Sequence, residues 1–290
     1  AGPVTRDRIL DPDGKAREQP GGSAFHAAAV HARLGLTTAL LTQLAARDRR
    51  ELLAPLDGVG IRFIVQPAHA TTRFITTVRD DGRDHAVPRV APPLKPAAFD
   101  RLTATAIQLG PLTRDDIPPA TVTAARERCT WLALDVQGLT RRVAAGRVRA
   151  IGGVPAEVLA HADILKADAA EARLITGWRE PRHAARALAA MGGGEALVTL
   201  GERGAHLAVG ERVQAVPPVD AGKAVDPTGC GDSFLAGYLA RRVRGDACER
   251  AARVAAAVAA RTATRYGAFT NDATAVYALL DGTRRPREDT

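Results

Sequence analysis

The chain has 290 residues, enough to bury a large hydrophobic core, which excludes a miniature protein held together by disulfides. Its 46% of hydrophobic and 25% of charged residues are typical of a globular protein and not of a disordered one. The net charge of +8 is scattered and only 4% of the residues are aromatic. This pattern argues against a nucleic-acid partner and favours a small anionic ligand such as a nucleotide.

Membrane, export and metal-cluster signals are weak throughout. The longest apolar runs, such as residues 254–260, are far shorter than the roughly 18 residues of a membrane helix. The first ten residues resemble neither a secretory signal nor a transit peptide, so we expect a cytoplasmic protein. The three cysteines (Cys129, Cys230 and Cys248) form no CxxC pair, which favours neither a disulfide framework nor a structural zinc site.

The first predicted elements are extended. Gly2-Pro3 resembles the end of a strand whose apolar run would lie upstream. Residues 71–78 are rich in β-branched side chains and are followed by Asp80-Asp81-Gly82 and then residues 83–87, which predicts a β-hairpin with a glycine turn. We expect this hairpin, at about residues 71–88, to form a small lid.

The rest of the chain alternates between short apolar runs and helical patterns. Gly177 and Gly192 stand where the carboxyl ends of helices favour glycine. The alternation predicts an α/β fold, residues 1–290 in one domain, with a mainly parallel sheet covered on both faces. The predicted strands are residues 104–109, 130–136, 163–166 and 197–200, and the predicted helices are residues 121–128, 169–176 and 181–191.

The most informative segment is VDPTGCGDSFLAGYL, residues 225–239. Gly229, Cys230 and Gly231 come directly before an amphipathic helix, whose unpaired amides and positive dipole end favour an anion. Glycines let a phosphate approach the backbone closely. Asp232 follows at once, where a carboxylate is placed either to take a proton from a hydroxyl or only to cap the helix. The pattern leaves both roles open.

Two motifs, one in this segment and one near the start of the chain, resemble those of a known family. DPTGCGD, residues 226–232, resembles the DTxGAGD signature of ribokinase and adenosine kinase-like carbohydrate kinases. GGSAFHAAAVHARLG, residues 21–35, is similar to the GGxxxNxAxxLARLG segment that these kinases place against the sugar. The resemblance covers nearly the whole chain and implies the ribokinase-like three-layer α/β/α sandwich with a β lid.

The resemblance also implies roles for single residues. Asp232 would be the base, and the backbone of Gly229, Cys230 and Gly231 would form the anion hole. Glu171, in the segment KADAAE, would help to hold a hydrated magnesium ion. The acceptor pocket would be lined by Asp7, Gly21, Gly22 and His26, and ATP would lie along Asp168, Thr199, Gly201, Gly204, Gly267 and Ala268.

Two residues depart from the family pattern. Asp168 replaces the asparagine of the family's NxxE motif, which removes amide donors and adds a charge. His26 replaces the asparagine of the GG motif by an imidazole, and it is placed either to face the substrate or to pack between helices. Gln137 and Arg141 follow a predicted strand at the sheet edge where α/β proteins bind ligands, and are further acceptor candidates.

These motifs predict an ATP-dependent, magnesium-requiring kinase that phosphorylates a hydroxyl group of a small polyhydroxylated molecule, such as a sugar or an inositol. A nucleoside kinase and a non-catalytic ligand-binding protein on the same fold stay open. So do a requirement for a monovalent cation and a homodimer formed through the lid. The chain has no GxxxxGK[ST] loop, no GxGxxG after a strand and no GxSxG elbow, which disfavours other nucleotide-binding and hydrolase folds.

Overall fold

A mainly parallel sheet forms the body of the chain in the computed structural model, which describes residues 1–11, 13–79 and 82–282. Four neighbouring strands, β7, β8, β11 and β12, run parallel, and β13 and β14 continue the sheet in antiparallel fashion. In spatial order the strands are β14 (Arg212–Val216), β13 (Ala205–Val209), β12 (Glu195–Thr199), β11 (Ile164–Asp168), β8 (Cys129–Asp135) and β7 (Ala104–Leu109).

The first residues of the chain join this sheet to a parallel pair, β3 (Ala39–Ala45) and β4 (Arg62–Ala68). The nitrogen of Ala1 donates to the carbonyl of Gln108 on β7, and the amide of Gly2 donates to the carbonyl of Leu41 on β3. Residues 1 and 2 therefore lie between β7 and β3, although the first strand of the chain, β1, begins only at Thr5.

Helices cover both faces of the sheet, as the sequence predicts. On one face α1 and α7 pack together over β7, and α7 packs on α8, which lies over β13 and β14. On the other face α3 lies over β7 and β8, α5 over β11 and β12, and α6 over β12 to β14. Bounds are α1 (Ser23–Arg33), α2 (Arg49–Leu53), α3 (Pro119–Arg126), α4 (Ala156–Ala160), α5 (Ala169–Thr176), α6 (Pro181–Met191), α7 (Cys230–Arg242), α8 (Cys248–Ala263) and α9 (Ala273–Gly282).

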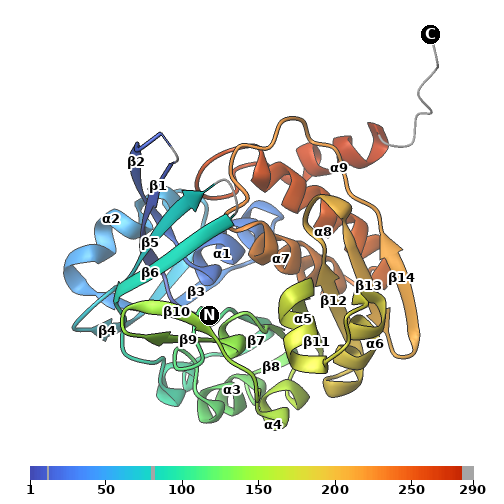
Figure 1. Ribbon diagram of the computed structural model, residues 1–290, viewed down its shortest axis with the longest axis horizontal. Coiled ribbons are helices and arrows are strands. Elements are labelled where there is room, and N and C mark those ends of the chain that lie inside the picture. Colours follow the sequence, from blue (N-terminus) through green and yellow to red (C-terminus); the bar gives the residue numbers. More distant parts are fainter. Residues whose placement is uncertain (12, 80–81, 283–290) are drawn as a thin grey trace.

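A second six-stranded sheet forms the lid, and Figure 1 shows its teal strands β5 and β6 crossing the left half of the molecule. The predicted hairpin is confirmed as the antiparallel pair of β5 and β6, although Asp80 and Asp81 of its turn lie outside the described residues. The lid is larger than this hairpin. Its order is β2 (Ala16–Gly21), β1 (Thr5–Leu10), β5 (Thr72–Arg79), β6 (Gly82–Arg89), β10 (Arg147–Ala150) and β9 (Arg141–Ala144).

Local signals fixed the bounds of two of the three predicted helices, while the third, predicted over residues 121–128, is α3, which begins and ends two residues earlier. The helices predicted over residues 169–176 and 181–191 are α5 and α6 with the same limits. Gly177 ends α5 in the left-handed conformation (φ 77°), which only glycine adopts without strain. Within the described part of the chain, no helix has both the length and the apolar character needed to cross a lipid bilayer.

Candidate active site

The amino end of α7 carries the glycine turn. Gly229 is its N-cap residue and has φ 76°, and a β-carbon there would lie 2.5 Å from the ring of His26. A β-carbon at Gly231 would lie 2.7 Å from the Nζ atom of Lys166. Gly229 therefore needs glycine, because its φ is positive and the His26 ring lies against it, whereas a side chain at Gly231 would require the end of Lys166 to shift.

Asp232 lies in the first turn of α7 and faces α1. Its Oδ1 atom accepts a short hydrogen bond from the hydroxyl of Ser23, the first residue of α1, and its carbonyl accepts one from the side chain of Gln108. The side chain thus stands at the start of the helix, beside the segment that follows Gly21 and Gly22. Neither Ser23 nor Gln108 stood out in the sequence, because a serine and a glutamine are common everywhere.

The amides of the turn are partly committed. Cys230 donates its amide to the carbonyl of Pro227, at 3.2 Å. Asp226 stabilises the turn, because its Oδ1 atom accepts hydrogen bonds from the amide and the hydroxyl of Thr228. The next amides along the helix, of Gly231 and Asp232, belong to the first turn and have no acceptor within the helix. An anion at this helix end would meet those two donors.

A buried ion pair lies behind the turn. Lys166 on β11 and Asp135 on β8 are register partners, and the distance from Nζ to Oδ2 is 3.0 Å. Burial works to lower the pKa of Lys166, but the carboxylates of Asp135, Glu171 and Asp232 outweigh it and raise that pKa. Lys166 therefore stays a cation beside Gly231. The sequence offered one signal for it, a lysine at the end of an apolar strand.

The lid supplies a half-buried carboxylate. Asp7 on β1 packs so closely on Gly21 that a β-carbon there would overlap its carboxyl group. Burial raises the pKa of Asp7 to about 6, with a smaller contribution from Asp226 and an opposing one from Thr5. Its Oδ1 atom is buried and makes no hydrogen bond to the described part of the chain. Asp7 is thus placed to receive a hydroxyl donor.

His26 is 1% exposed and packs edge-on against Phe25. Neither ring nitrogen has a hydrogen-bond partner within the described ranges. Burial lowers the pKa of His26, although Asp232 and Asp226 act in the opposite direction, so the ring is neutral at pH 7. The ring lies against Gly229, so the residue that replaces the family's asparagine stands beside the glycine turn.

The predicted site residues that follow β8 and β11 contact one another in sequence. Gln137 is next to Arg141, whose guanidinium lies 3.1 Å from the Oε1 atom of Glu171. The Oε2 atom of Glu171 accepts from the amide of Asp168, and Asp168 accepts from the amide of Glu171. This reciprocal capping box starts α5, and it explains both acidic residues without a ligand.

The hydrogen bonds and the ion pair of Glu171 also determine whether this residue can bind a magnesium ion directly. Both carboxylate oxygens of Glu171 are engaged, and Arg141 and Lys166 already offset its charge. In the described residues, no group of three or more His, Cys, Asp and Glu side chains is arranged around a metal. The residues therefore do not fit a magnesium ion bound directly by the protein, and a water-mediated contact of Glu171 stays a prediction.

The predicted nucleotide residues lie in two places. Thr199 ends β12, and Gly201 and Gly204 flank the turn to β13, both with positive φ. A β-carbon at Gly204 would overlap the carbonyl of Val216. Gly267 and Ala268 lie in the segment between α8 and α9, next to Tyr266, whose ring stacks under Arg17 of the lid at 3.6 Å. Among the described residues no hydrogen bond joins that segment to the β12–β13 turn.

Comparison with known proteins places this geometry in context. The model of the "pfkB family carbohydrate kinase" matches residues 5–275. A cytidine kinase of Thermococcus kodakarensis is 27% identical over 267 residues, which are 87% of this chain and 91% of that protein.

Solved structures share the whole fold. A pyrophosphate-dependent kinase in the ribokinase family, complexed with a pyrophosphate analogue and myo-inositol, has a TM-score of 0.85 at 21% identity, with 97% of this chain and 98% of that chain covered. A nucleoside kinase of Burkholderia thailandensis in complex with inosine has a TM-score of 0.79 at 20% identity, with 98% and 96% covered. The predicted ribokinase-like sandwich with a β lid is confirmed.

Proposed function

Because the chain belongs to the pfkB family of carbohydrate kinases, we propose that it transfers the terminal phosphoryl group of ATP to a hydroxyl group of a small sugar or cyclic polyol. One observation carries the proposal. The Asp232 carboxylate and the Lys166 ammonium stand at the same glycine turn, one at the start of α7 and the other against Gly231. A base and a fixed cation beside free helix amides are the parts that phosphoryl transfer needs.

In this mechanism the hydroxyl oxygen of the substrate attacks the terminal phosphorus of ATP. As it does so, Asp232 accepts the proton of that hydroxyl group. The new O–P bond forms while the bond to the bridging oxygen breaks, and ADP leaves. The amides of Gly231 and Asp232 and the Lys166 ammonium would stabilise charge on the oxygens of the transferred group. A magnesium ion bound to the triphosphate would offset part of its charge, and Glu171 would reach that ion through water.

The acceptor would lie between the lid and α1. Asp7 would accept hydrogen bonds from substrate hydroxyls, at the edge formed by Gly21 and Gly22. His26, being neutral, has one ring nitrogen able to donate and one able to accept. An imidazole in place of a compact amide would change the hydrogen bonds offered to the acceptor, which favours a ring unlike ribose, and Gln137 and Arg141 would border the acceptor.

A nucleoside is the second candidate acceptor. It is favoured by the full-length likeness to a cytidine kinase, which at 27% identity exceeds the identity to the inositol-bound structure. Pyrophosphate is likewise an alternative donor, since a neighbour with a TM-score of 0.85 uses it. Thr199, Gly201, Gly204, Gly267 and Ala268 would contact the nucleotide only if ATP is the donor.

The test is a screen of phosphoryl transfer with ATP or pyrophosphate against sugars, inositols and nucleosides, detected by product mass. Asp232→Asn is expected to lower turnover by about two to four orders of magnitude, the share of a positioned base. The control is Asp100→Asn, which removes the same charge from a side chain that is 66% exposed. Near-native turnover in Asp232→Asn would refute the base, and no transfer to any acceptor would favour a non-catalytic binding protein.

A further inference from the structure

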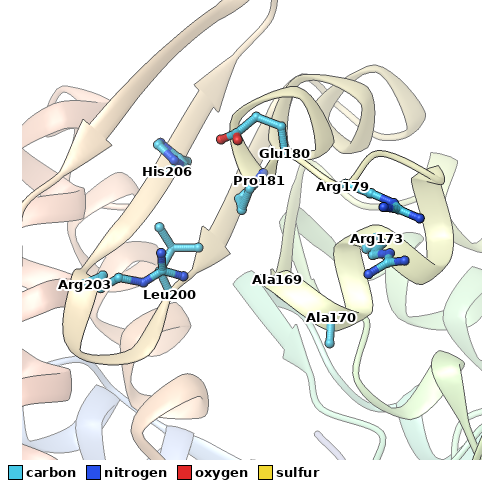
Figure 2. A pocket seen from close by; sticks show the side chains of 9 residues that line it. All are labelled: Ala169, Ala170, Arg173, Arg179, Glu180, Pro181, Leu200, Arg203 and His206. Carbon is cyan, nitrogen blue, oxygen red and sulfur yellow. The ribbon is translucent and has the colours of Figure 1, made fainter.

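An open pocket of about 400 Å³ lies between α5, α6 and the β12–β13 turn. Figure 2 shows Arg173 and Arg179 on one side of it, with Arg203 and His206 on the other. Its volume falls within the range of small-molecule sites. We call it the arginine pocket, and it is lined by Ala169, Ala170, Arg173, Arg179, Glu180, Pro181, Leu200, Arg203 and His206.

The three guanidinium groups have no acidic partner in the described part of the chain. The nearby Arg186 differs, because it pairs with Glu211 at 3.6 Å. Glu180 is the one acidic residue among those that line the pocket. The lining therefore carries a surplus of positive charge that the protein itself does not neutralise, and each planar guanidinium suits a phosphate oxygen pair.

Backbone donors add to this charge. Ala169 and Ala170 are the first two residues of α5, so their amides belong to the helix turn that lacks internal acceptors. The capping box satisfies only the amides of Asp168 and Glu171. An anion in the pocket would thus meet side-chain cations and a helix amino end together.

The pocket adjoins residues that the sequence predicts along the nucleotide. A second open pocket on the lid side of α5 shares Ala170 and Arg173 with it and reaches Arg141, Asp168 and Glu171. The β12–β13 turn, which holds Gly201 and Gly204, forms the opposite wall. Both pockets therefore lie at the carboxyl ends of β11 and β12, the strands that end at Asp168 and Thr199.

We infer that the arginine pocket binds phosphate groups, and that these are the phosphates of the donor that are not transferred. The second part rests on the proposed function, whereas the first does not. Three arginines without an acidic partner in the described residues would offset the charge of those phosphates. Recognition of the donor then depends on its phosphates more than on its base.

The experiment measures binding of inorganic pyrophosphate to the full chain by calorimetry at fixed, moderate salt. Arg173→Gln, Arg179→Gln and Arg203→Gln are each expected to raise Kd by about tenfold, the effect of losing one charge-assisted hydrogen bond. Arg186→Gln loses the same charge outside the pocket and is expected to stay within twofold of the parent. Equal weakening in all four variants, or no binding by the parent at millimolar pyrophosphate, would overturn the inference.

Two further measurements are needed. The first distinguishes donor phosphates from a free anion in the pocket, and the second distinguishes failure of the pocket from failure of the proposed base. If the pocket holds donor phosphates, the three variants raise the KM of the donor and leave that of the acceptor unchanged, and pyrophosphate competes with ATP. If it holds a free anion, pyrophosphate inhibits without competing, and the site stands while its donor role falls. Pyrophosphate binding by Asp232→Asn tests the pocket without turnover, so a failed base and a failed pocket give different results.

Discussion

Under the proposed function, the two sides of the candidate site would recognise their ligands with opposite chemistry. On the acceptor side, His26 is buried and Asp7 is half-buried, and each has buried polar atoms without a hydrogen-bond partner in the described residues, next to tight glycine contacts. On the donor side, Arg173, Arg179 and Arg203 line an open pocket and stay exposed. A neutral polyol gains most from hydrogen bonds in a dry cavity, whereas a polyanion is attracted through water.

Between the acceptor side and the donor side, the ammonium group of Lys166 lies close to acidic side chains. Lys166 lies against the turn that Asp232 follows, and Asp135 holds Lys166 from behind. This pair is buried, so its charges are neither screened by salt nor free to move. The comparison therefore predicts that the junction is the most sensitive part of the site.

The largest expected effect comes from Lys166→Met. It leaves Asp135 buried without a counter-charge, which is expected to lower the free energy of unfolding by about 3 to 5 kcal/mol, measured by urea titration. The double variant Asp135→Asn with Lys166→Met removes both charges and is expected to recover most of that stability. The turnover of the double variant is expected to remain about a hundredfold below that of the parent, because the transferred phosphoryl group has lost a fixed cation. Full turnover in the double variant would mean that Lys166 is only structural.

A smaller effect is expected at the wall between the two sides. Gly229→Ala places a β-carbon 2.5 Å from the His26 ring at φ +76°, and we expect a loss of about 2 to 4 kcal/mol in urea titrations. Gly58 is the matched control, since it has φ +77° and nothing within 4 Å, so its change to alanine costs the backbone strain alone. Adding His26→Ala to Gly229→Ala is expected to reduce the loss to the Gly58 level. No recovery would show that the ring does not press on the turn.

Local patterns predicted much of this molecule. The glycine turn, the helix behind it and the start and end of α5 depend on neighbours within a few residues, so composition and spacing were enough. The lid hairpin was found for the same reason. Strands β1 and β2 were not, because TRDRIL and AREQPG lack the alternation of apolar and polar residues that marks a strand.

The electrostatics of the site escaped prediction because they depend on register. Lys166 and Asp135 meet only since β11 and β8 are adjacent and aligned at those residues. The arginine pocket likewise needs three segments to converge, from α5, from the loop before α6 and from the β12–β13 turn. Nothing in the spacing of Arg173, Arg179 and Arg203 along the chain marks them as neighbours.

The smallest predicted effect concerns pH on the acceptor side. The pKa of Asp7 rises from 3.8 to about 6 on folding, so the folded state binds that proton more tightly than the unfolded state. Stability that the protonated group provides is therefore lost as pH rises from about 4 through 6. Asp7→Asn removes this dependence, and its advantage over the parent is expected to grow by about 1 to 3 kcal/mol between pH 4 and pH 7.

The measurement is urea unfolding at several pH values, with Asp57→Asn as the control because Asp57 is exposed. The same variant sharpens the functional comparison. If the ionised Asp7 receives substrate hydroxyls, kcat/KM for the acceptor rises through pH 6 in the parent and loses that step in Asp7→Asn, while the KM of the donor does not change. Parallel stability curves for Asp7→Asn and the parent would instead mean that Asp7 ionises as it does in water, and that the acceptor side is wetter than its burial indicates.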